Sequence, residues 1–205
     1  LNGWTLIQSL AMSKMSLPPV ESFIYHGRGI IPSNICQQVI DETEKTTWEK
    51  HGWYDVEKNS TTSEETQELD VSNILDTSFS LFQQYINDSI KTYTNLHAYQ
   101  SPKTDRIVFK YSKFRMNRYS VGQMMRPHHD HIYSLFDGEE KGIPVLSIIV
   151  NFNKSYTGGD LCFWDDYVLE LGQGDIIIFP SNFMYPHHVT SILSGQRYSA
   201  VAWAW

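Results

Sequence analysis

Residues 144–180, PVLSIIVNFNKSYTGGDLCFWDDYVLELGQGDIIIFP, decide the fold of this chain. Short runs of β-branched and aromatic residues, of which 176–179 is the clearest, alternate with glycine, asparagine and aspartate. Such runs bounded by turn residues predict strands rather than helices. The glycines at 158–159 and in 172–175 are expected to turn the chain between strands, which is a structural role.

The same pattern continues on both sides of this stretch. Strands are expected at residues 107–119, 124–131, 144–152, 160–164, 176–179, 186–192 and 197–205. Closely spaced short strands joined by tight turns predict a rolled antiparallel sheet. The expected fold class is therefore mixed but mainly β, with a double-stranded β-helix (jelly roll) as its core.

The N-terminal part of the chain has helical patterns instead. A first helix is expected to begin at Ser33, whose hydroxyl can cap it, and to carry an apolar stripe of Ile35, Cys36, Val39 and Ile40. A second helix is expected over about residues 73–92. Both should pack on the major sheet. Residues 1–205 are then a single domain, with helical support over 1–105 and the β core over 106–205.

Composition limits the classes of partner. The chain has 205 residues, 41% of them hydrophobic, which is typical of a globular protein with a core. Its net charge of −7 disfavours a nucleic-acid partner, because binding to phosphates depends on Lys and Arg. A local basic run, Arg106, Lys110, Lys113, Arg115 and Arg118, is expected to be split between strand faces as solvated edge charges.

Nothing in the sequence indicates a membrane or secretory protein. No apolar run approaches the ~18 residues of a membrane span. The first residues lack the basic region of a secretory signal. Cys36 and Cys162 are expected to be buried reduced thiols. These features predict a cytoplasmic location, although Leu1 is no initiator and residues are expected to precede it.

Two histidine-rich segments suggest a metal site. On a strand, His128 and Asp130 share a face while His129 points the other way. Two imidazoles and a carboxylate are the donors of a mononuclear non-haem iron(II) site with open coordination positions. The second imidazole comes from His187 or His188. Arg197 follows after a turn, and its guanidinium is suited to holding a carboxylate bidentately.

Five motifs occur in a characteristic order. They are YSVGQMMRPHHD (119–130), NFN (151–153), GGDLCF (158–163), GQGD (172–175) with the strand that follows, and HHVT to GQRYS (187–199) leading to Trp203. Together they resemble the 2-oxoglutarate/iron(II) dioxygenases of the prolyl-hydroxylase type. The resemblance covers about residues 107–205, with a weaker match at 31–40.

The resemblance implies the ligands and the cofactors. Fe(II) is expected to be held by His128, Asp130 and His187, since the family ligand directly precedes x-Val-Thr. The co-substrate 2-oxoglutarate would chelate the iron and pair its distal carboxylate with Arg197. The residues expected to line that cofactor pocket are Tyr119, Ser147 and Ser199. O2 is the oxidant, and ascorbate is implied as an accessory reductant.

The implied reaction is hydroxylation of a C–H bond with release of succinate and CO2. Asp130 favours hydroxylation, because halogenating relatives lack that carboxylate. Asn151 stands where many relatives have tyrosine, and Arg197 where the collagen-type branch has lysine. The arginine favours the oxygen-sensing and bacterial branch. The expected substrate is a proline-containing protein or peptide.

Alternatives from other classes remain open at this point. A hydroxylase of a free amino acid or small molecule would need a closed pocket with its own charged groups. A nucleic-acid demethylase usually carries a second arginine where this chain has Trp203. A zinc hydrolase or a non-enzymatic metal-binding jelly roll leaves Arg197 unexplained. The polar segment 55–70 suits either a mobile loop over the site or a featureless surface loop.

Overall fold

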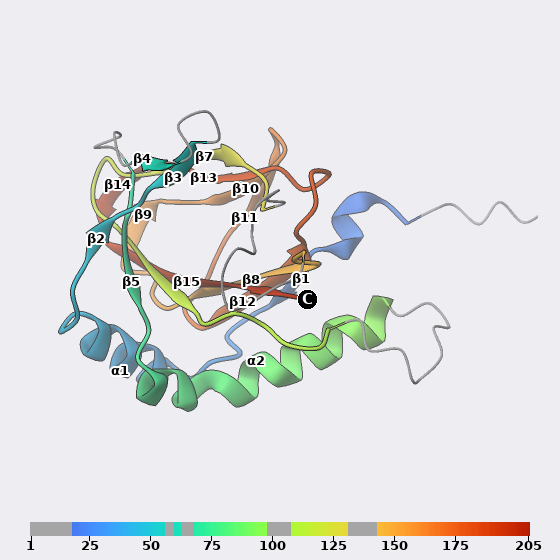
Figure 1. Cartoon of the computed structure of the whole chain (residues 1–205), viewed down its shortest axis with the longest axis horizontal. Helices are drawn as coiled ribbons and strands as arrows, with labels where there is room; N and C mark the ends of the chain where they lie inside the picture. The colour runs from blue at the N-terminus through green and yellow to red at the C-terminus, as the bar shows by residue number, and fades with distance from the viewer. Residues whose placement is uncertain (1–17, 56–59, 63–67, 98–107, 131–142) are drawn as a thin grey trace, which may run out of the picture.

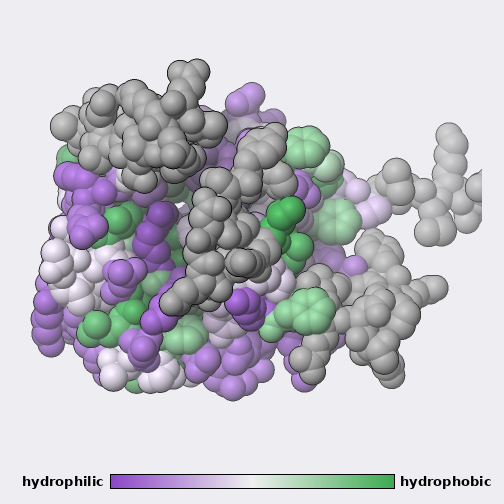
Figure 2. Space-filling model, in the orientation of Figure 1, coloured by the Kyte–Doolittle hydropathy of each residue, from purple (hydrophilic) through white to green (hydrophobic). Residues whose placement is uncertain are grey.

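The computed structural model describes residues 18–55, 60–62, 68–97, 108–130 and 143–205. Two antiparallel sheets face each other, and two helices cover the outer face of the larger sheet (Figure 1). In the orientation of Figure 1, the coloured part of the surface is mostly hydrophilic, with small apolar patches (Figure 2).

The larger sheet has seven strands. In spatial order they are β1 (Tyr25–Gly27), β12 (Asp175–Pro180), β8 (Leu146–Asn151), β15 (Arg197–Ala204), β6 (Arg115–Tyr119), β5 (Asp70–Asn73) and β2 (Glu49–Lys50). Three of these strands come from the N-terminal part of the chain, which therefore contributes to the sheet as well as to the helices.

The opposing sheet has four strands, in the order β11 (Tyr167–Leu169), β10 (Leu161–Phe163), β13 (His187–Val189) and β7 (Met125–His128). Two further pairs are β14 (Ile192–Gly195) with β9 (Tyr156–Gly158), and β3 (Trp53–Asp55) with β4 (Ser60–Thr62). The helical elements are a 3-10 turn η1 (Val20–Phe23), α1 (Ser33–Thr43) and α2 (Asp76–His97).

Strand alternation divides the core into two layers. On β12, Ile176 and Ile178 pack in the layer between the larger sheet and the helices. Ile177 and Phe179 point the other way, into the space between the two sheets. Phe82 of α2 is fully buried in the helix-side layer. The helices therefore stabilise the larger sheet from outside and leave its inner face for the site.

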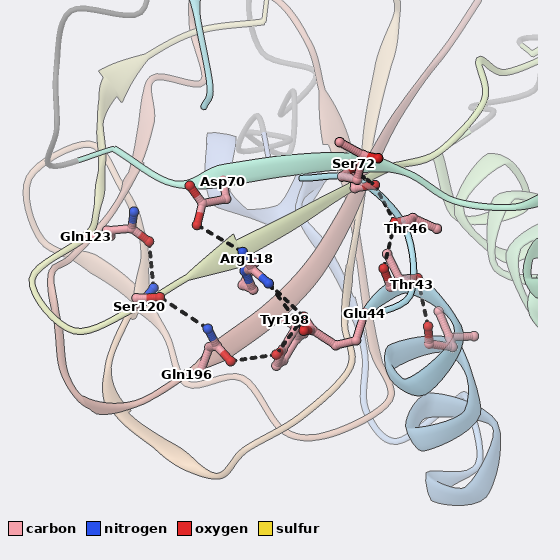
Figure 3. Close-up of polar contacts among 12 residues, drawn as sticks. Thr43, Glu44, Thr46, Asp70, Ser72, Arg118, Ser120, Gln123, Gln196 and Tyr198 are labelled. Carbon is pink, nitrogen blue, oxygen red and sulfur yellow. Dashed lines mark hydrogen bonds and ion pairs between the residues drawn. The ribbon is translucent and has the colours of Figure 1, made fainter. Parts of the chain in front are cut away.

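Arg118 joins the helical layer to the sheet. Its guanidinium pairs with Glu44, just after α1, at 3.0 Å and with Asp70 of β5 at 3.4 Å (Figure 3). It also lies 4.2 Å from the centre of the Trp48 ring. Tyr198 of β15 donates its hydroxyl to Glu44, so neighbouring strands share the same carboxylate. On β6, residue 118 thus faces the helices, and its odd-numbered neighbours face the opposing sheet.

The fold class expected from the sequence is confirmed: the chain is mainly β, with helices packed on the major sheet. The division into parts at residue 105 stays a prediction. Among the residues that the structure describes, neither helix has the length and apolar character needed to cross a bilayer.

Several boundaries differ from expectation. Ser33 does not cap α1, because Pro32 is the N-cap residue and no side chain makes a cap hydrogen bond. Of the strand expected over 107–119 only β6 forms, since the backbone N–H groups of residues 109, 110 and 112 donate instead to the carbonyls of Trp203 and Trp205. Helix α2 begins and ends later than the expected 73–92. Most of the polar segment 55–70 lies outside the described residues, so its role stays a prediction.

Candidate metal and co-substrate site

The three expected metal ligands converge between the two sheets. β7 and β13 are antiparallel neighbours in which His128 lies opposite His187, and Asp130 lies two residues beyond the end of β7. One ligand atom from each of the three side chains lies within 4.8 Å of the others. The Nε2 atom of His128 is 3.5 Å from one Asp130 oxygen, and that of His187 is 3.9 Å from the other.

Backbone carbonyls orient both imidazoles. His128 Nδ1 is 2.9 Å from the carbonyl oxygen of Arg126, and His187 Nδ1 is 3.1 Å from that of Tyr185. Because a carbonyl only accepts, each Nδ1 carries the proton and donates. Each Nε2 then presents a lone pair towards Asp130, as a metal ligand requires.

The charge states also suit a metal. Burial alone would raise the pKa of Asp130, but the neighbouring imidazoles of His187 and His128 and the hydrogen bond from Ser147 hold it well below its usual range. Burial lowers the pKa of His187 to about 4. A carboxylate beside a neutral imidazole is the protonation state in which these groups bind a divalent cation.

Ser147 supports the carboxylate. Its hydroxyl donates to Asp130 at 2.6 Å and is 2.8 Å from the hydroxyl of Ser181. On β8, Ser147 lies opposite Trp203, whereas Asn151 lies opposite Ser199 near Arg197. Four residues along a strand correspond to about 13 Å. The structure therefore places Ser147 with the metal ligands rather than with Arg197, and its expected role in the cofactor pocket stays a prediction.

A pocket of about 390 Å³ lies between the sheets, and the triad lines it. Tyr119, Arg197 and Ser199 line it as well, as expected for a co-substrate pocket. Its walls also include apolar side chains of both sheets: Met125, Ile149, Leu161, Val189 and Val201. Such walls restrict water around the polar groups and strengthen their interactions.

Arg197 is a buried cation with an unused donor. It is 1% exposed, and its Nε donates to Asn151 at 3.2 Å. Its Nη1 has no hydrogen-bond partner within the described part of the chain. The guanidinium lies 5.0 Å from the centre of the Tyr119 ring, and burial raises the pKa of that phenol. An unpaired buried donor costs about 1–3 kcal/mol, so the arrangement fits a bound carboxylate.

His188 is separated from the triad. It lies opposite Cys162 on β10, on the other face of β13 from His187. The structure thus brings His187 to the candidate metal site. The ring of Trp164 packs against that of Tyr185, with 5.8 Å between the ring centres.

Two polar pocket residues of β6 were missed by reasoning from the sequence. Arg115 and Asn117 line the pocket on the same face of β6 as Tyr119. The expectation of solvated edge charges is wrong for Arg115 and Arg118, which are only partly exposed. The period-2 alternation counted back from Tyr119 was the signal that could have identified both.

Comparisons with known proteins agree with this site. Residues 114–205 match the family model of the 2OG-Fe(II) oxygenase superfamily. A PKHD-type hydroxylase of Shewanella baltica (strain OS185) is 33% identical over 91 residues, covering 42% of this chain and 40% of the relative. A PKHD-type hydroxylase of Psychrobacter sp. (strain PRwf-1) is 34% identical over 61 residues, covering 28% and 23%. The chain thus spans less than half the length of these relatives.

Solved structures share the fold at low sequence identity. A viral collagen prolyl hydroxylase from Paramecium Bursaria Chlorella virus-1 has a TM-score of 0.61 at 14% identity, covering 89% of this chain and 94% of that one. A Pseudomonas putida prolyl-4-hydroxylase has a TM-score of 0.60 at 17% identity, covering 88% and 91%. The resemblance found in the sequence is confirmed: residues 114–205 are similar to the 2OG-Fe(II) oxygenase superfamily, and the chain shares its fold with prolyl hydroxylases of known structure.

Proposed function

We propose that this protein is an Fe(II)- and 2-oxoglutarate-dependent oxygenase that hydroxylates a C–H bond, with a prolyl residue of a protein or peptide as the substrate. One observation carries the proposal. The His128–Asp130–His187 triad and the unpaired donor of the buried Arg197 belong to the same pocket. A structural metal site alone would leave the buried guanidinium unexplained.

Different residues of the pocket would bind the metal and the co-substrate. His128, Asp130 and His187 would hold Fe(II), and their three donors leave coordination positions open. Arg197 would hold the distal carboxylate of 2-oxoglutarate through its free Nη1, with Tyr119 beside it. Iron with 2-oxoglutarate and O2 supplies the oxidising power, and 2-oxoglutarate leaves as succinate and CO2.

The chain contributes orientation and a dry pocket. The carbonyls of Arg126 and Tyr185 fix the tautomers of the two imidazoles. The Ser147 hydroxyl fixes the rotation of the Asp130 carboxylate. Loss of a hydrogen bond that supports a metal ligand in this way typically lowers metal affinity or activity 10–100-fold. Ascorbate as an accessory reductant and a cytoplasmic location remain predictions.

The choice of a proline substrate rests on relatives rather than on contacts. Solved neighbours are named as collagen prolyl hydroxylase and prolyl-4-hydroxylase. Another neighbour is a Trichoplax adhaerens prolyl hydroxylase in complex with a hypoxia inducible factor peptide, with a TM-score of 0.62 at 13% identity. Trp203 lines the pocket where demethylases have their second arginine, which disfavours a nucleic-acid substrate.

Anaerobic titration with Fe(II) and 2-oxoglutarate tests the proposal. We expect a visible metal-to-ligand charge-transfer band that needs both additions. His187→Ala should lose the band because the triad loses a ligand, while His188→Ala is the matched control and should keep it. Absence of the band in the unaltered protein, or equal bands in all three proteins, would contradict the proposed function.

A further inference from the structure

The pocket contains a second arginine that the proposed cofactors do not use. Arg115 and Arg197 both line it. In the sheet Arg197 lies opposite Tyr119, and Arg115 lies opposite Val201. The two arginines are thus separated by four residues of strand, or about 13 Å along the ladder. 2-Oxoglutarate has one carboxylate for the metal and one for Arg197, so Arg115 is left over.

Arg115 is positioned by neutral groups. Its Nε donates to the Asn117 side chain at 3.2 Å, and its guanidinium lies 5.6 Å from the centre of the Trp203 ring. In the described part of the chain no carboxylate forms a salt bridge with it. Arg118, three residues on, pairs with two carboxylates. Burial lowers the pKa of Arg115, so holding this charge in the pocket has a cost.

The charges of the loaded pocket leave Arg115 uncompensated. Apart from histidines, the charged residues that line the described pocket are Arg115, Asp130 and Arg197. The two positive charges of iron and that of Arg197 are cancelled by Asp130 and the two carboxylates of 2-oxoglutarate. One positive charge then remains, on Arg115. A buried, pre-oriented guanidinium of this kind is suited to a carboxylate.

We propose that Arg115, supported by Asn117 and Trp203, binds a carboxylate of the substrate. The inference rests on the proposed function and narrows its substrate class. The hydroxylated residue must bring a carboxylate with it into the pocket. Its source is the α-carboxylate of a free or C-terminal proline, or an acidic side chain next to an internal proline. A proline flanked only by neutral residues lacks this group.

Another role for Arg115 would be to balance the charge of Asp130 in the fold. An arginine in that role would affect the metal site, so its loss would change the binding of Fe(II) and 2-oxoglutarate. If Arg115 binds the substrate instead, its loss leaves the binding of Fe(II) and 2-oxoglutarate unchanged and weakens only the binding of the substrate. The band described above therefore separates the two roles.

The experiment is calorimetric titration of the whole chain, loaded anaerobically with Fe(II) and 2-oxoglutarate. Three pairs of probes differ only in a carboxylate: L-proline and prolinamide, a tripeptide ending in proline and its C-terminal amide, and an internal Pro-Glu peptide and its Pro-Gln analogue. The variants are Arg115→Met, the conservative Arg115→Lys, and Lys113→Met as control. Lys113 is an exposed cation paired loosely with Asp76 at 3.7 Å.

In the unaltered protein we expect one pair to show about 10- to 100-fold tighter binding of its carboxylate member, and that pair identifies the source. Arg115→Met should reduce the preference for the carboxylate probe to about twofold and leave the charge-transfer band unchanged. Arg115→Lys should keep part of this preference, and Lys113→Met should keep all of it. The inference is overturned if no pair shows a preference, if Arg115→Met keeps it, or if Arg115→Met loses the band. A missing band in the unaltered protein overturns the proposed function as well.

Discussion

Replacing Arg197 by methionine removes the positive charge proposed to hold the far end of 2-oxoglutarate. Methionine keeps an unbranched apolar stem of similar reach but has no donor. In the unaltered protein Nε is already bonded to Asn151, and Nη1 has no partner among the described residues. A hydrogen bond to a charged group contributes about 1.5–3 kcal/mol. At the upper end, the dissociation constant for 2-oxoglutarate should rise about 150-fold.

The assay is anaerobic calorimetric titration of the Fe(II)-loaded proteins with two ligands. 2-Oxopentanoate has the same chain length as 2-oxoglutarate but lacks its distal carboxylate, so it should bind both proteins with nearly equal affinity. Arg197→Lys keeps the charge without the planar fork and should fall between them. The reasoning is refuted if Arg197→Met binds 2-oxoglutarate as the unaltered protein does, or if 2-oxopentanoate loses as much affinity.

Folding stability gives an independent measurement. The unpaired Nη1 costs about 1–3 kcal/mol in the free protein, so Arg197→Met should unfold in urea at no lower concentration than the unaltered protein. Added 2-oxoglutarate stabilises the folded protein according to its affinity, and this gain should be lost in the variant. A variant that is unstable but still responds to 2-oxoglutarate would show that Arg197 serves the core only.

Two further predictions concern the turns that hold β12 in place. The Asp175 carboxylate accepts hydrogen bonds from the backbone of Gly29 and Gly172 and pairs with His26 at 2.7 Å. Burial alone would raise the pKa of Asp175, but these partners hold that pKa below the ordinary 3.8. The stability that they provide is present above the unfolded-state pKa and lost as the pH falls below it. The free energy of unfolding of Asp175→Asn should therefore be about 1–3 kcal/mol lower at neutral pH, and it should decline less steeply in acid. Unfolding followed by circular dichroism at several pH values measures both, and identical pH profiles for the two proteins would exclude this role. Gly174→Ala should destabilise the protein far more than Gly122→Ala does, as measured by urea unfolding. Both glycines have a positive φ, but of the two only Gly174 would bring an added Cβ against a backbone atom, the Ile31 carbonyl oxygen at 2.1 Å. Equal losses of about 1–2 kcal/mol would mean that conformation alone sets the cost.

The sequence by itself determined the local pattern. Alternation predicted that His128 and Asp130 point the same way, and they do meet, although Asp130 lies two residues beyond β7. Turn residues separated strands that the structure contains, such as β8, β12 and β15. The pleat of a strand fixes these relations within a few residues. The short strands β9 and β11 were missed, since three residues carry too little pattern and their stability depends on distant partners.

Only the tertiary structure decided which residues meet. Ser147 was assigned to the anion-binding end of the pocket, but register puts it beside Asp130. Alternation puts Arg115 and Arg118 on opposite faces of β6, but only the structure shows that Arg115 lines the pocket and that Arg118 pairs with carboxylates next to the helices. Strand order and register are set by burial and hydrogen bonding between segments far apart in the chain. Local periodicity separates the two faces of β6 but does not say what each face contacts, which depends on the pairing of β6 with β15.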